Sequence, residues 1–131
     1  MHTILQPEGW RPPRGYSNGM VASGSFVFVS GQVGWNAKCE FESDDLVAQT
    51  RQALDNVASV LRAGGAEPEH MVSLTWYFTD KTEYLARQKE LGEAYRSVMG
   101  KNFPTMTAVQ VASLVESRAK VEIQAIAVVP R

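Results

Sequence analysis

A single carboxylate lies in an apolar run near the C-terminus and is the first candidate for chemistry. Glu122 follows Val121 and precedes Ile123, and residues 125–129 are all apolar. A buried carboxylate is costly unless it is paired or used, and a carboxyl group in an apolar cleft can exchange protons near neutral pH. The structural alternative is a glutamate at a strand edge, solvated or paired with Arg118 or Lys120. The residues alone favour that alternative.

Other residue types that commonly carry catalysis are scattered along the sequence. His2 and His70 are isolated, and with Cys39 they do not form a metal-ligand spacing, so no metal site is expected. Neither a Ser-His-Asp triad nor a phosphate-binding glycine loop is indicated. Cys39 lies between charged residues and is interpreted as a bystander rather than a reactive thiol.

Length and charge narrow the classes of protein. The 131 residues predict one domain, residues 1–131, that can bury a core without disulfides. The formal net charge is -1, from 13 basic and 14 acidic residues without a basic cluster, which argues against a nucleic-acid partner. The single cysteine, the lack of a signal-peptide core and the lack of a membrane-length apolar segment predict a soluble, cytoplasmic protein with no membrane partner.

Hydrophobic periodicity predicts the elements that position these residues. An extended arm over residues 1–19 is expected to precede two short strands, which lie within residues 21–32 around a turn at residues 23–25. The remaining elements are a helix capped by Ser43 and ended by Gly64, a strand at 71–79, a helix from Asp80 to Met99, and strands at 106–112 and 120–129. The ββαβαββ order, with a sheet of about six strands, predicts a two-layer α+β domain.

The predicted helices cover one face of the sheet and leave the other without a partner in the chain. Residues 125–129 are apolar at consecutive positions, which indicates that both faces of the last strand are covered. A homo-oligomer packed through the open face would cover them.

Five sequence pieces, in order along nearly the whole chain, carry a resemblance to a known family. They are Gly15-Tyr16-Ser17-Asn18-Gly19, Ser30-Gly31-Gln32, residues 49–57, residues 102–111 and residues 121–127. The chain resembles the reactive intermediate deaminase family, also called the YjgF or endoribonuclease L-PSP family. The resemblance implies a chorismate-mutase-like fold and a homotrimer with pockets at the subunit interfaces. It also implies hydrolysis of 2-imino or 2-enamino acids, with release of ammonia and no cofactor.

The same resemblance implies roles for individual residues. Glu122 matches the glutamate that contacts the substrate and orients or activates water, which reverses the preference for a structural role. Tyr16 matches a tyrosine that lines the pocket, although a packing tyrosine after a turn is the alternative. Gly31 matches a glycine whose backbone faces the substrate, and a strand-end turn is its alternative. The backbone of Ala108 matches a position that offers an amide N–H.

Met106 departs from the family pattern. Members that hydrolyse imino acids have an arginine there, which binds the substrate carboxylate through two charge-assisted hydrogen bonds. A thioether cannot replace that cation and makes this end of the pocket apolar. Arg14 is the candidate to take over the carboxylate, and the hydroxyl of Thr107 is a candidate contact for a neutral polar substrate.

Three functions therefore stay open. The first is a cofactor-free hydrolase of imines or enamines whose specificity Met106 has altered. The second is a trimer that binds a small metabolite, or protects against reactive ones, without turnover. The third is the ribonuclease of the older family name, which the charge distribution makes the weakest.

Overall fold

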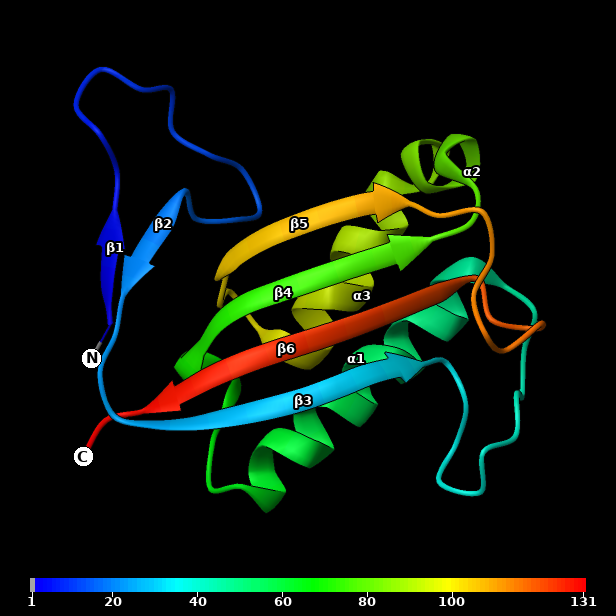
Figure 1. Ribbon diagram of the computed structural model, residues 1–131. Helices are drawn as coiled ribbons and strands as arrows, with labels where there is room; N and C mark the ends of the chain where they lie inside the picture. The colour runs from blue at the N-terminus through cyan, green and yellow to red at the C-terminus, as the bar shows by residue number, and fades with distance from the viewer. Residues whose placement is uncertain (1) are drawn as a thin grey trace.

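A four-stranded sheet with helices on one face forms the body of the protein in the computed structural model, which describes residues 2–131 (Figure 1). The strands are β1 (Thr3–Leu5), β2 (Gly19–Val21), β3 (Ser25–Val33), β4 (Met71–Phe78), β5 (Thr105–Gln110) and β6 (Val121–Val129). The helices are α1 (Leu46–Ala63), α2 (Lys81–Ala86) and α3 (Gln88–Met99), with a short 3-10 helix η1 at Pro68–His70. The predicted two-layer α+β class and the order of its main elements are confirmed.

The strand order in the main sheet is β3-β6-β4-β5. β4 and β5 are parallel, because the chain returns through α2 and α3, while the other neighbouring pairs are antiparallel. Alternate residues of β4, including Leu74, Trp76 and Phe78, are buried against the helices. Paired residues of neighbouring strands lie on the same face of a sheet. The register with β4 therefore shows on which face each side chain of β5 and β6 lies.

The predicted six-stranded sheet is wrong. β2 pairs with β1 in a separate two-stranded sheet that lies apart from the main sheet, so the arm contains a strand that its Pro- and Gly-rich sequence did not indicate (Figure 1). The turn at residues 23–25 separates the two sheets. Gly24 has φ +146°, and a Cβ atom there would lie 2.1 Å from the carbonyl oxygen of Val129. Only glycine lets the chain turn so close to the end of β6 and enter β3.

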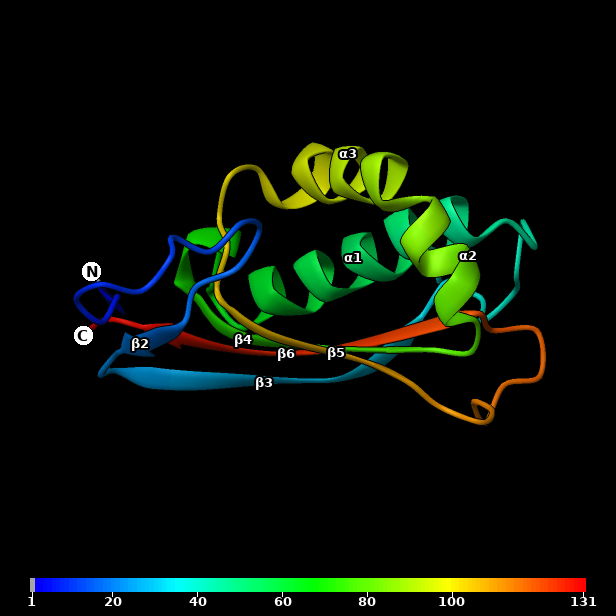
Figure 2. The ribbon, with the colours of Figure 1, turned by 90° about the horizontal axis from the view of Figure 1, so that it is seen from above.

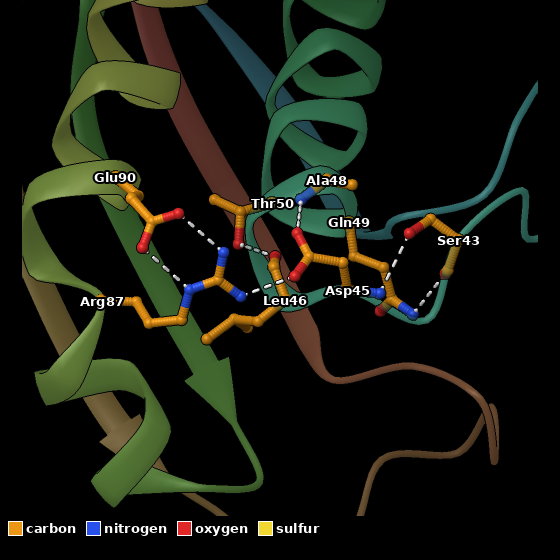
Figure 3. Close-up of polar contacts among 8 residues, drawn as sticks. All are labelled: Ser43, Asp45, Leu46, Ala48, Gln49, Thr50, Arg87 and Glu90. Carbon is orange, nitrogen blue, oxygen red and sulfur yellow. Dashed lines mark hydrogen bonds and ion pairs between the residues drawn. The ribbon is translucent and has the colours of Figure 1, made fainter.

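Two details of the helices also differ from the expectation. The N-cap of α1 is Asp45, whose carboxylate accepts from the N–H of Ala48, whereas Ser43 accepts from the N–H of Asp45. The second predicted helix is divided at Arg87 into α2 and α3. The Arg87 guanidinium donates to the carboxylates of Asp45 and Glu90 and so joins this break to the start of α1 (Figure 3).

One face of the sheet is left uncovered by the chain (Figure 2). β6 alternates, so that Ile123 is buried under the helices, while Glu122 and Gln124 lie half-buried on the opposite, open face. Phe26 and Phe28 of β3 are 57% and 69% exposed there. Both faces of β6 were expected to be covered, and within one chain the helix face is covered along its length, whereas the open face is fully covered only at Val128. No helix among the described residues is long and apolar enough to cross a membrane.

Candidate functional site

The N-terminal arm is fixed beside the start of β5 by one buried serine. The N–H of Ser17 donates to the carbonyl oxygen of Pro104 at 3.0 Å, and its hydroxyl donates to that of Phe103 at 2.6 Å. Ser17 also forms a parallel bridge with Thr105 and is 6% exposed. These contacts hold the preceding residues of the arm next to the edge of the main sheet.

The arm, β4, β5, α2 and α3 together enclose a cavity of about 440 Å³, which we call the α3 cavity. Four of the residues predicted from the sequence line it: Arg14, Tyr16, Met106 and Ala108. Met106 pairs with Leu74 and Ala108 with Trp76 in the parallel register of β4 and β5, so both side chains lie on the helix face. The fold therefore brings together sequence positions that are about ninety residues apart along the chain.

Aromatic side chains form much of the wall of the α3 cavity. The rings of Tyr95 and Phe103 stack with centroids 5.5 Å apart, and those of Trp76 and Tyr95 are 6.1 Å apart. Burial raises the pKa of the Tyr95 hydroxyl, which donates a hydrogen bond to the carbonyl oxygen of Asn102. Tyr95 is therefore a fixed, neutral part of the wall rather than a proton donor in exchange with solvent.

The charged groups that line the α3 cavity are both cationic. Arg14 comes from the arm and Arg96 from the last turn of α3, and among residues 2–131 no aspartate or glutamate lines the cavity. Arg96 was not predicted as a site residue. The one signal for it in the sequence is Gly92, a glycine inside a helix and one turn before Arg96, where glycine is unfavourable without a packing or functional reason.

Glu122 and Gly31 form a second group on the open face of the sheet. The register of β3 and β6 shifts between Val29 and Gln32, which places Gly31 in an irregular segment. A Cβ atom on residue 31 would lie 2.0 Å from Oε2 of Glu122. The absence of a side chain at Gly31 is therefore what makes room for this carboxylate.

The structural alternative for Glu122 is a solvated or ion-paired side chain, and its half-buried position on the open face agrees with the solvated form. Arg118 pairs with Asp44 at 2.9 Å, and no cation among the described residues forms an ion pair with Glu122. Glu122 does not line the α3 cavity. Thr107 alternates with Met106 along β5 and so lies on the open face with Glu122, while the hydroxyl of Thr105 donates to the carbonyl oxygen of Val72 at 2.6 Å.

The predicted site residues thus divide into two groups on opposite faces of one sheet. The α3 cavity offers cations, aromatic rings and an apolar thioether, whereas the Gly31–Glu122 pair offers a carboxylate without a counter-ion. Acid–base chemistry at a bound ligand needs both, and one chain does not place them together.

The chain is similar to the members of one protein family in both its sequence and its structure. The family described as Endoribonuclease L-PSP matches residues 9–129. A 2-iminobutanoate/2-iminopropanoate deaminase of Escherichia coli strain K12 is 34% identical over 105 residues, which is 80% of each chain. The crystal structure of YyfB from Yersinia pestis, a protein of unknown function of the conserved Rid family, has a TM-score of 0.87 at 30% identity over 98% of each chain. E. coli TdcF, crystallised with bound serine, has a TM-score of 0.69 at 31% identity and covers 97% of this chain and 98% of its own.

Proposed function

The chain belongs to the endoribonuclease L-PSP family, also called the YjgF or Rid family, and we propose that it is a cofactor-free hydrolase of a reactive imine or enamine. In the reaction one water molecule adds to the carbon of the C=N bond. The C–N bond then breaks, and the products are a carbonyl compound and ammonia. The name of the E. coli relative, a 2-iminobutanoate/2-iminopropanoate deaminase, supports this reaction class.

The observation that carries the proposal is the separation of the two groups of site residues. Each complete site forms between two copies of the chain, with the α3 cavity from one and the Gly31–Glu122 pair from its neighbour. The exposed Phe26 and Phe28 lie on the same face as Glu122 and supply the apolar surface for such an interface. A homotrimer, the assembly that the family resemblance implies, contains three equivalent interfaces of this kind.

The roles of the residues follow from their chemistry. The carboxylate of Glu122 accepts a proton from the attacking water and returns a proton to the leaving nitrogen. The open backbone at Gly31 lets the substrate approach this carboxylate closely. Tyr16 and the backbone of Ala108 line the substrate side of the site, in the α3 cavity.

Met106 changes which imines this site accepts. A carboxylate held by an arginine fork gains about 1.5–3 kcal/mol from each charge-assisted hydrogen bond, and a methionine at this position offers neither bond. Short substrates such as 2-aminoacrylate, the enamine tautomer of 2-iminopropanoate, lack an apolar body that could contact Met106 and should therefore be poor substrates. A substrate with a larger apolar body can gain contact with Met106 and the neighbouring rings instead.

The rival function is a trimer that binds the same metabolite without turnover, since an aromatic cavity free of carboxylates favours binding whether or not chemistry follows. Ammonia release from freshly generated 2-aminoacrylate and 2-imino-3-phenylpropanoate separates the two. The hydrolase predicts acceleration of the phenyl compound by the wild type and none by Glu122→Gln, with both proteins at three times the 14.5 kDa chain mass on a calibrated sizing column. Equal rates for the two proteins would remove Glu122 from catalysis, and binding of either imine without faster ammonia release would favour the rival.

A further inference from the structure

The side chain of Arg96 lies back along α3, close to Gly92. In a helix, side chains lean toward the N-terminus, so a residue covers the turn before its own Cα. Gly92 is one turn before Arg96, and a Cβ atom on residue 92 would lie 3.2 Å from an Nη atom of Arg96. The missing side chain at Gly92 leaves the guanidinium room to lie back over the helix at the α3 cavity.

Neither cation of the cavity has an ionic partner in the described part of the chain. Among residues 2–131, no carboxylate forms an ion pair with Arg14 or Arg96, and neither guanidinium makes a cation–π contact. Both residues are exposed, so their charges lie at the mouth of the cavity and not in its apolar interior. Two like charges at the mouth of an acid-free cavity create a local positive potential that attracts an anion.

The interior of the cavity suits a planar apolar group. Trp76, Tyr84, Tyr95 and Phe103 contribute rings, and Met106 adds a flexible thioether that packs well against aromatic edges. A ligand with an anionic group at one end and an aryl group at the other would match both the cationic mouth and the aromatic interior of the cavity. A guanidinium presents a planar fork that matches a carboxylate.

We propose that Arg96, assisted by Arg14, anchors the carboxylate of an aryl-bearing acid in the α3 cavity. The anchor for the anion thus comes from α3 and the arm, and not from position 106 on β5. The inference rests on the proposed use of this cavity as the ligand site, but it concerns binding and does not depend on turnover.

Phenylacetate, its neutral isostere phenylacetamide and acetate together test the inference by titration calorimetry on the full-length protein. Phenylacetate is expected to bind at least about tenfold more tightly than phenylacetamide, which lacks the charge, and than acetate, which lacks the ring. Equal affinities for phenylacetate and phenylacetamide, or no binding of phenylacetate at millimolar concentration, would overturn the inference.

Variants of Arg96 test whether this residue binds the carboxylate of the ligand. Arg96→Gln should weaken phenylacetate binding at least about tenfold and leave phenylacetamide unchanged, and Arg96→Lys should recover part of the loss. Arg62→Gln is the matched control, because Arg62 pairs with Glu67 at the end of α1 and does not line the cavity. An unchanged affinity in Arg96→Gln, or an equal loss for both ligands, would contradict the role of Arg96.

The same titration separates this inference from the proposed hydrolase. Glu122→Gln should lose turnover and still bind phenylacetate, since the variant removes a negative charge from the shared site and leaves Arg14 and Arg96 in place. A wild type that binds phenylacetate through Arg96 but never accelerates ammonia release would sustain the anchor and reject the hydrolase. A wild type that hydrolyses imines, together with an Arg96→Gln variant that binds phenylacetate as tightly as the wild type, would support the hydrolase and reject the anchor.

Discussion

Gly31 and Glu122 are in direct contact across β3 and β6, and a Cβ atom on residue 31 would lie 2.0 Å from Oε2 of the glutamate. The φ of Gly31 is not positive, so the close approach and not the backbone conformation requires glycine here. The contact joins the Ser30-Gly31-Gln32 motif to the motif at residues 121–127, on the face of the sheet that the helices leave open.

Gly31→Ala should displace the Glu122 carboxylate and lose activity while the protein stays folded. The nearest atoms to the new methyl group belong to the far end of a flexible side chain, which can rotate away, so the unfolding free energy should fall by no more than about 1 kcal/mol. Hydrolysis should fall at least about tenfold, because a positioned acid–base group contributes about 10²–10⁴-fold and a displaced carboxylate keeps only part of that effect. Steady-state rates and denaturant melts check this. Full activity in Gly31→Ala would show that the position of this carboxylate does not matter.

Gly92→Ala should stabilise the protein while Gly92→Leu should abolish phenylacetate binding. Alanine is favoured over glycine inside a helix by about 1 kcal/mol, and the new methyl group needs the guanidinium to move by only a few tenths of an ångström. A leucine occupies the space over which Arg96 lies. Denaturant melts measure the first effect and calorimetry the second. If Gly92→Leu folds and binds phenylacetate as the wild type does, Arg96 does not need this space.

Ser17→Ala should loosen the arm. The variant leaves the Phe103 carbonyl without the donor that Ser17 supplies at 2.6 Å in a buried position, at a cost of about 1 kcal/mol. Arg14 and Tyr16 should then be less well placed, so phenylacetate affinity should fall as well. Hydrogen exchange at Tyr16 and calorimetry check the two effects. Ser23→Ala, at an exposed position in the turn between β2 and β3, is the control and should change neither.

The Asp45–Arg87 pair should give the fold a definite pH dependence. The hydrogen bond from Arg87, and then the one from the N–H of Ala48, lower the pKa of Asp45 below its ordinary value of 3.8. A lowered folded-state pKa contributes stability that is fully present above the unfolded pKa and is lost as the pH falls through the folded one. Asp45→Asn should therefore unfold more easily than the wild type at about pH 7, and the difference should be smaller at about pH 3. Denaturant melts at both pH values check this, and a difference independent of pH would contradict it.

Much of the fold follows from local patterns. Alternation in residues 71–79 and the 3.6-residue period of α1 predicted the strand and helix that make up the core. The missed features are those that depend on distant partners. β1 is a strand only because β2 pairs with it, and the division at Arg87 depends on Asp45, which is 42 residues away.

The site was predicted only in part, because it too depends on residues that are distant in the sequence. Sequence motifs marked Tyr16, Met106 and Ala108, and the structure brings them into one cavity. The motifs could not show that Glu122 and Thr107 lie on the face of the sheet opposite the α3 cavity, because the face of a side chain depends on the register of the strands. Arg96 belongs to none of the motifs, and its guanidinium lies over Gly92, which no motif marks either.

The central claim is that each site is shared between two copies of the chain, and subunit mixing tests it most directly. Glu122→Gln keeps a native cavity, and Ala108→Trp fills the cavity but keeps a native glutamate, so each variant alone should be inactive on the imine that the wild type hydrolyses. After unfolding and refolding together in equal amounts, the whole mixture should recover about a quarter of the wild-type rate. About three quarters of randomly assembled trimers are mixed, and in each of these about one site in three pairs a native cavity with a native glutamate. Mixed trimers that form, as mass spectrometry can show, and yet remain inactive would contradict the shared site.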